Sequence, residues 1–226
     1  MPQENAWDRE YKNTTFLTKK NEPQTDVIRF VKFLKKEGLE IENLNILDLG
    51  SGTGRNSFYF SKIGNNVWGI EISKTAIKIA EENAKNSDLN IKYIKQSIGE
   101  TFPSEKNFFD IILDVTSSNS LNEKEREIYL EESKRVLKDT GYFFVKALCK
   151  EGDENAKFLL KNNPGEEKDT YIMPETEIVE RVWTKEDFLD TYGKYFQIIK
   201  IDKKTTYTKI NNRSYKRNFW IVYMKK

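Results

Sequence analysis

Short apolar runs alternate with amphipathic stretches through the first 150 residues of the chain. The apolar runs predict strands at 45–49, 66–71, 91–94, 108–114 and 142–148. The amphipathic stretches predict helices at 25–37, 55–63, 73–85 and 122–137. Because strands that alternate with helices at this spacing build βαβ units, the pattern predicts a parallel sheet that is buried on both faces.

Three helix ends carry signals in the sequence. Thr25 or Asp26 is the expected N-cap of the first helix. Asn122, with Glu125 three residues later, resembles a capping box, in which each side chain bonds to the other residue's backbone. Gly141 is expected to end the helix that Asn122 starts, because glycine is common just beyond a helix C-terminus.

The last third of the chain has a different pattern. Residues 150–183 are polar and interrupted by prolines, which is typical of an insertion or a lid. A helix that starts near Thr184 and strands at 196–201 and 218–224 are expected to close the chain. Since no repeat or long linker divides it, we expect one domain over 1–226. Its expected parts are an N-terminal arm and helix at 1–40, a cofactor-binding core at 45–148, the insertion or lid at 150–183, and a helix with two strands at 184–226.

The most specific signal is the stretch DLGSGTGR, from Asp48 to Arg55, at the end of the first predicted strand. Gly50, Gly52 and Gly54 stand at alternate positions, where they let the chain turn tightly and let a ligand approach the backbone. The spacing differs from the G-x-G-x-x-G of dinucleotide sites, and no Gly-Lys-Ser/Thr follows as in a P-loop. A strand, a glycine turn and a helix in this order predict a site for a nucleotide-type cofactor.

Glu71 ends the second predicted strand, in the stretch GIEIS. A carboxylate at this place can accept hydrogen bonds from both hydroxyls of a ribose. Together with the glycine turn, it indicates a ligand that has a free ribose diol and needs no pyrophosphate cradle.

These motifs resemble those of the class I S-adenosylmethionine-dependent methyltransferases. The resemblance covers about residues 45–148, through DLGSGTGR, GIEIS, FFDIILD and RVLKDTGYFFV. It implies a three-layer α/β sandwich of Rossmann-like arrangement, with a mostly parallel seven-stranded sheet and an N-terminal helical arm. It also implies S-adenosyl-L-methionine as the cofactor.

The resemblance also implies the cofactor-binding residues by position. The glycine turn would lie under the methionine part, Glu71 would hold the ribose, and Ile72 would lie against the adenine. The family usually has an Asp after the third strand, where this chain offers Ser97 as a hydrogen-bonding alternative. Two members also allow a structural role: Asp48 as a brace of the turn, and Asp114 as a cap of the segment after the fourth strand. The expected set is Asp48, Gly50, Ser51, Gly52, Thr53, Gly54, Asn56, Glu71, Ile72, Gln96, Ser97, Ile98 and Asp114.

Catalytic candidates are few, because the chain has no histidine and a single cysteine, Cys149. This composition excludes His general bases, Ser-His-Asp triads and Cys-based zinc sites, so no metal is expected. Methyl transfer from a sulfonium depends mainly on alignment of the reacting groups. Asp114 and Tyr11 are the expected catalytic residues, with Glu175 and Glu177 as alternatives.

A small molecule is the favoured acceptor. Trp7, Tyr11 and Phe16 lie in the N-terminal arm and could cover the cofactor, although Trp7 and Tyr11 also fit an i,i+4 pair that packs on the core. The fourth predicted strand is followed by DVTSSNS, whereas DNA-amine methyltransferases have an Asn/Asp-Pro-Pro-aromatic motif there. This difference disfavours methylation of DNA bases.

RNA is an alternative acceptor, because residues 200–226 carry nine basic residues against one acid, with Tyr207 and Tyr215 between them. A solvated hairpin explains the same charges, and a protein acceptor or a non-catalytic cofactor-binding role also stays open. The net charge of +2 by itself predicts no polyanionic partner. Without an export segment or an 18-residue apolar run, the chain is expected to be cytoplasmic and to work without a membrane. The sequence leaves its oligomeric state undecided.

Overall fold

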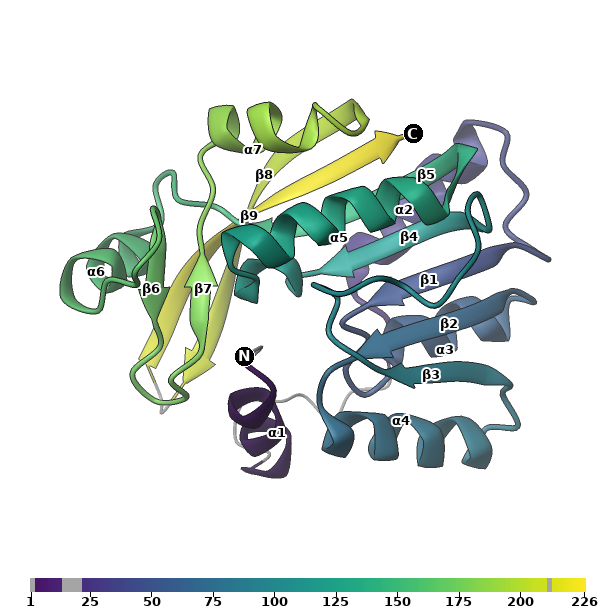
Figure 1. Cartoon of the computed structure of the whole chain (residues 1–226), viewed down its shortest axis with the longest axis horizontal. Helices are drawn as coiled ribbons and strands as arrows, with labels where there is room; N and C mark the ends of the chain where they lie inside the picture. Colours follow the sequence, from purple (N-terminus) through teal and green to yellow (C-terminus); the bar gives the residue numbers. More distant parts are fainter. Residues whose placement is uncertain (1–2, 14–21, 211–212) are drawn as a thin grey trace.

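One mixed sheet of seven strands forms the centre of the chain (Figure 1). The structure is a computed structural model, and it describes residues 3–13, 22–210 and 213–226. The strand order is β3-β2-β1-β4-β5-β9-β8; the first five strands are parallel, and β9 runs antiparallel to both of its neighbours. The strands are β1 (Asn45–Leu49), β2 (Asn66–Glu71), β3 (Ile91–Lys95), β4 (Phe109–Val115), β5 (Leu137–Leu148), β8 (Gln197–Ile210) and β9 (Arg213–Lys225).

Helices cover both faces of this sheet, as the continuous apolar strands predict. The helices are α1 (Glu4–Asn13), α2 (Thr25–Lys36), α3 (Arg55–Lys62), α4 (Lys74–Asn86), α5 (Glu123–Val136), α6 (Glu154–Asn162) and α7 (Lys185–Tyr192), with a 3-10 turn, η1 (Ser118–Ser120). In β1, Ile46 packs in a core with side chains of α2 and α3. Leu47 and Leu49 pack in a second core with side chains of α5 and α7. Two cores on opposite faces make the three-layer α/β sandwich that the sequence predicts.

Two predicted helix ends are wrong. The N-cap of α2 is Gln24, and the carboxylate of Asp26 instead accepts hydrogen bonds from Lys146 Nζ (3.1 Å) and Lys204 Nζ (2.5 Å). Gly141 lies inside β5, which begins directly after α5 ends at Val136. A Cβ at Gly141 would lie 2.6 Å from Leu137 Cδ1, so the glycine allows a close approach within the strand and does not stop the helix. The capping box at the start of α5 is confirmed.

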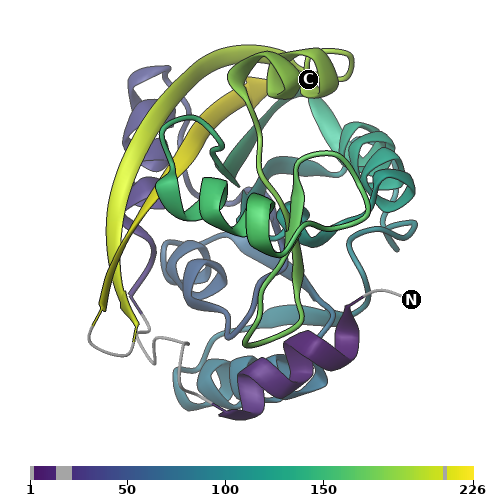
Figure 2. The ribbon, with the colours of Figure 1, turned by 90° about the vertical axis from the view of Figure 1, so that its left-hand side faces the viewer.

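Residues 150–183 form a compact unit on the β8–β9 hairpin. The unit contains α6 and a small antiparallel sheet of β6 (Thr170–Ile172) and β7 (Val179–Arg181). Its apolar side chains, among them Leu159, Tyr171 and Val182, form a third buried cluster with Leu148 at the end of β5. Figure 2 shows this unit facing the viewer between the long curved hairpin and α1.

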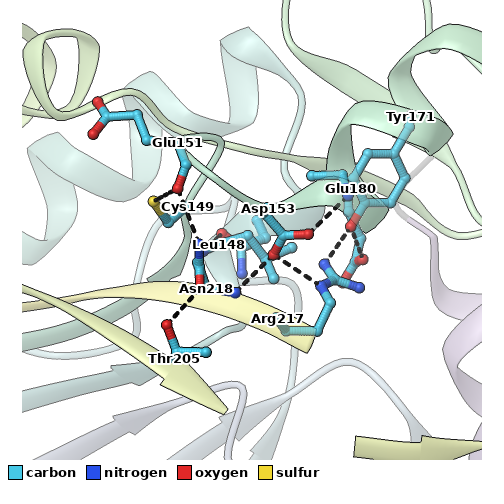
Figure 3. Close-up of polar contacts among 11 residues, drawn as sticks. Leu148, Cys149, Glu151, Asp153, Tyr171, Glu180, Thr205, Arg217 and Asn218 are labelled. Atoms are coloured by element: carbon cyan, nitrogen blue, oxygen red, sulfur yellow. Dashed lines mark hydrogen bonds and ion pairs between the residues drawn. The ribbon is translucent and has the colours of Figure 1, made fainter. Parts of the chain in front are cut away.

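A buried polar network ties the unit to β9 (Figure 3). One Asp153 oxygen caps α6 at Ala156 N (2.8 Å), and the other accepts from Asn218 N (2.7 Å). Arg217 Nη2 donates to Tyr171 Oη (2.7 Å), which in turn donates to Glu180 (2.8 Å). Because these buried and half-buried groups bond across the contact between the insertion and β9, they hold the insertion in one place on the hairpin.

The Asp153→Ala substitution should lower the free energy of unfolding by about 3 kcal/mol, because it removes a helix cap and leaves buried donors without a partner. Urea denaturation measures the change. Asp202→Ala is the matched control, since Asp202 forms an exposed pair with Lys200, and it should change the free energy by less than about 0.5 kcal/mol. Equal effects of the two substitutions would contradict a structural role for the Asp153 network.

Candidate functional site

A cavity of about 310 Å³ lies where β1, β2 and β4 end and α1 crosses over them. The carboxyl ends of parallel strands at a change in strand order are the usual ligand position in such sheets. The expected site residues that line the cavity are Tyr11, Gly50, Ser51, Gly52, Thr53, Asn56, Glu71, Ile72, Ser97 and Ile98. The expected residues outside its wall are Asp48, Gly54, Gln96 and Asp114.

The glycine turn has a backbone shape that requires glycine. Gly50, Gly52 and Gly54 have φ angles of +66°, +56° and +87°, which other residues rarely adopt. A Cβ at Gly50 would lie 2.1 Å from Ser117 Oγ, and a Cβ at Gly52 would lie 2.6 Å from Tyr11 Oη. Because the glycines have no Cβ, Ser117 and Tyr11 can lie against the backbone of the turn, which also lines the cavity.

Glu71 fixes this turn and also faces the cavity. Its carboxylate is 4% exposed and accepts from Gly52 N (2.9 Å) with one oxygen and from Ser73 N (2.8 Å) with the other. Burial raises the pKa of Glu71, and these backbone hydrogen bonds oppose the shift. Each oxygen keeps a lone pair, so a ligand diol in the cavity can still bond to it.

Asp48 stabilises the turn without lining the cavity. It is 1% exposed, and its carboxylate accepts from Ser57 Oγ (2.6 Å) on α3. Burial raises its pKa to about 6, although the hydrogen bond from Ser57 opposes the shift. Gly54 is the N-cap of α3 and, like Asp48, lies outside the cavity wall.

Asp114 occupies the end of β4 but points away from the cavity wall. One oxygen accepts from Ser117 N (2.8 Å) and the other from Tyr129 Oη (2.6 Å), and both lie 3.3 Å from Ser118 N. These donors surround a fully buried carboxylate, so the geometry matches a cap of η1, and Asp114 does not line the cavity. The neighbours Val115, Thr116 and Ser117 line the cavity in its place.

Two residues after β3 also have different environments. Gln96 donates through Nε2 to the Thr101 carbonyl (2.7 Å) and faces away from the cavity. Ser97 lines the cavity, and its hydroxyl accepts from Gly99 N (3.1 Å). Of these two residues, Ser97 is thus the one that lines the cavity.

The helix α1 lies across the cavity mouth, and it is held through Asp8 in its middle and through Gln3 just before its first residue. Asp8 accepts from Ser73 Oγ and Thr75 N, both at 2.9 Å, at the start of α4. Gln3 Nε2 donates to the carbonyls of Ser120 (2.7 Å) and Val179 (2.8 Å), in η1 and β7. The helix therefore bridges the two sides of the cavity mouth.

Trp7 and Tyr11 face the cavity from α1. Their ring centroids are 6.4 Å apart, so they form an aromatic pair and line the cavity at the same time. Burial and the nearby Glu71 carboxylate raise the pKa of Tyr11, which keeps its phenol neutral. Phe16, the third expected aromatic residue of the arm, lies outside the described residues.

Several lining residues escaped the sequence analysis. Arg55 is the first residue of α3 and lines the cavity with a guanidinium that is near Asp48 and Tyr11. Its place directly after the glycine turn was a signal available in the sequence. Gln3, Gln24, Leu121 and Glu125 also line the cavity, but they come from segments that only the folded chain brings together.

In the part of the chain that the structure describes, no three His, Cys, Asp or Glu side chains are placed to hold a metal ion. The helices there all lack the length and apolarity needed to cross a bilayer.

Comparisons of sequence point to one family. The family model of a methyltransferase domain matches residues 41–207. The ubiquinone biosynthesis O-methyltransferase of Pelagibacter ubique is 33% identical over 110 residues, which are 49% of this chain and 44% of that protein. A putative protein N5-glutamine methyltransferase of Methanocaldococcus jannaschii is 33% identical over 93 residues, which are 41% of this chain and 44% of that protein. The matches span less than half the length of either relative.

A solved structure supports the fold. A SAM-dependent methyltransferase from Methanosarcina mazei superposes with a TM-score of 0.75 at 20% sequence identity, and the match covers 91% of this chain and 98% of that chain. The similarity confirms the predicted Rossmann-like architecture with its seven-stranded sheet.

The Glu71→Ala substitution should weaken S-adenosylmethionine binding by about 1–3 kcal/mol, because it removes a buried charged acceptor and the anchor of Gly52. Isothermal titration calorimetry measures the loss. Glu82→Ala, on the exposed side of α4, should bind as the wild type does. An unchanged affinity in Glu71→Ala would show that Glu71 does not hold the ligand.

Asp48 should make stability depend on pH. An acid whose pKa is raised by folding stabilises the fold when it is protonated, so its contribution is complete below about pH 4 and is lost as the pH rises through 6. Relative to Asp48→Asn, the wild type should therefore lose up to about 3 kcal/mol of unfolding free energy between about pH 4 and pH 7. Urea denaturation at a series of pH values tests this, and parallel curves would mean that Asp48 titrates normally.

Proposed function

Because the chain belongs to the methyltransferase-domain family, we propose that it transfers the methyl group of S-adenosylmethionine to a small-molecule acceptor. The observation that carries the proposal is the position of α1 across the cavity mouth, where Gln3 and Asp8 hold the helix to opposite sides. A cavity closed in this way admits a small molecule more readily than a folded macromolecule.

The residues of the site fit this cofactor. The Gly50 and Gly52 positions provide backbone that a Cβ would obstruct, and the buried Ser51 hydroxyl has no partner among the described residues. Glu71 keeps lone pairs for a ribose diol, and Arg55 places a cation for the carboxylate of the methionine part. The donor set thus matches a ligand with a ribose diol and an amino-acid end.

The bound cofactor would supply a methyl group that is already activated as a sulfonium. The chain itself then has to hold the acceptor in line with that group and to exclude water. Val115, Thr116 and Ser117 form the wall at the end of β4, and Tyr11 faces them from α1. We assign Tyr11 to positioning through its neutral phenol, and Asp114 to holding η1 in place.

The basic C-terminal residues support an RNA acceptor less strongly than their number suggests. Lys204 bonds to Asp26, Arg217 to Tyr171, and Lys226 Nζ to the Leu137 carbonyl. These cations stabilise the fold and are not free for phosphates. A protein acceptor stays the second candidate, because one curated relative is a putative protein methyltransferase.

The experiment that tests the function uses S-adenosylmethionine labelled on its methyl group, incubated with the purified protein and an extract of its own cells. Label should appear in the small-molecule fraction and should depend on the protein. The Gly52→Val variant is the control for the site, because its side chain would collide with Tyr11. Label in the protein or RNA fraction would replace the proposed acceptor, and tight cofactor binding without any transfer would support a non-catalytic role.

A further inference from the structure

Glu125 brings a second carboxylate to the cavity. Among the described residues that line it, Glu71 and Glu125 are the two carboxylates. Both oxygens of Glu71 accept backbone hydrogen bonds, from Gly52 and Ser73. Glu125 is different, because its Oε2 accepts from Asn122 N (3.0 Å), whereas its Oε1 has no hydrogen-bond or ion-pair partner among the described residues. One oxygen of a half-buried carboxylate is therefore available to a ligand.

Two contacts fix the place of this carboxylate. The first is the capping box, in which Glu125 N also donates to Asn122 Oδ1 (2.9 Å), so the side chain is held at the first turn of α5. The second is with Gly99, in the loop after β3. A Cβ at Gly99 would lie 2.6 Å from Glu125 Cβ and 2.9 Å from its Cγ. The start of α5 therefore lies against the loop that follows β3.

The strand order indicates which part of the cofactor would lie near Glu125. Strand β2 lies between β1 and β3, and Glu71, at its end, is proposed to hold the ribose. The glycine turn after β1 and Arg55 fit the methionine part, so the base would extend to the other side, toward the loop after β3. The residues after β2 and β3 that line the cavity there are Ile72, Ser97 and Ile98. Because Gly99 of the same loop contacts Glu125, this carboxylate lies at the base end of the cavity.

We infer that Glu125 Oε1 accepts a hydrogen bond from the 6-amino group of adenine, and that it selects adenine against a 6-oxo purine. An ionised carboxylate only accepts hydrogen bonds, and the amino group donates them. Ser97 complements this contact: its hydroxyl accepts from Gly99 N, so its own hydrogen is free for the N1 acceptor of adenine. A 6-oxo purine has a carbonyl oxygen and an N–H at these two places, so it would set an acceptor against the carboxylate.

This inference rests on the proposed function, since it assumes that S-adenosylmethionine is the ligand of the cavity. It adds a residue that determines which base the site accepts. It does not depend on the acceptor of the methyl group, so the two proposals can fail separately.

A purely structural role in the capping box is the alternative for Glu125, and two substitutions separate the roles. Asn122→Ala removes the side-chain cap of α5 and leaves the Glu125 carboxylate in the chain. Glu125→Gln keeps the shape of the side chain and an oxygen for the capping box, in which glutamine also serves. It replaces the charged, acceptor-only group with an amide that can accept or donate.

The first test needs no variant. Isothermal titration calorimetry compares the binding of S-adenosylhomocysteine and S-inosylhomocysteine to the wild type, because these ligands differ only at positions 1 and 6 of the purine. The Kd of the inosyl ligand should be higher by about tenfold or more, as for the loss of a hydrogen bond to a charged group. Equal Kd values would overturn the inference.

The second test follows the ratio of the two Kd values in the variants. Glu125→Gln should bring the ratio close to one, since its amide can donate to the 6-oxo group. Asn122→Ala should lower the melting temperature by a few degrees but keep the ratio of the wild type. An unchanged ratio in Glu125→Gln, or an equal fall of the ratio in both variants, would assign Glu125 to the capping box alone.

The outcomes also separate this inference from the proposed function. If S-adenosylhomocysteine does not bind the wild type, the cofactor site is wrong, and both proposals are overturned. A preference for adenine that depends on Glu125, together with methyl label in the protein or RNA fraction, would support this inference and overturn the small-molecule acceptor alone.

Discussion

The carboxylate of Glu71 is the contact on which the site depends. It accepts from Gly52 on one side and from Ser73 on the other, so one side chain joins the glycine turn after β1 to the start of α4 after β2. Ser73 also donates to Asp8 of α1. The position of the helix that closes the cavity is therefore set, through two hydrogen bonds, by the residue that is proposed to hold the ribose.

Buried carboxylates around the turn share one physical constraint. Asp48, Glu71 and Asp114 are all enclosed, and burial raises the pKa of each. Each carboxylate accepts hydrogen bonds from the protein. The donors are Ser57 for Asp48, backbone amides for Glu71, and Tyr129 with backbone amides for Asp114. The same burial that positions these groups thus opposes their ionisation, and the hydrogen bonds that they accept from the protein offset part of that cost.

The fold could be predicted largely from the sequence, because strands buried on both faces leave continuous apolar runs with helices between them. The glycine turn was also readable, since its positive φ angles restrict residue type at fixed places. Glu71 lines the cavity at the end of β2, and its contact with a ribose stays a prediction. The functions of Asp48 and Asp114 were not decided by the sequence, because the direction of a carboxylate depends on Ser57 and Tyr129, which come from other elements.

Other parts of the site depend on contacts over long distances in the chain. Nothing in the local pattern shows that Gln3 meets η1 and β7, or that Arg126 is buried and bonds to the Leu121 carbonyl. The insertion at 150–183 had the composition of a loop, yet the network of Asp153, Tyr171 and Arg217 gives it a fixed place. Such networks form between residues whose proximity only the tertiary structure creates.

The position of α1 has a consequence for the order in which the chain folds. Gln3 bonds to Val179, 176 positions later, although α1 is the first helix to be made. A contact of this separation forms late, because the intervening chain must first be ordered. The glycine turn, α4 and the core strands can therefore assemble while the cavity is still open. The bond of Asp8 to Ser73 spans only 65 positions, so α1 can dock on α4 before it reaches β7. A partly synthesised chain can therefore hold α1 on one side of the cavity, and the bond of Gln3 to Val179 completes its attachment on the other side.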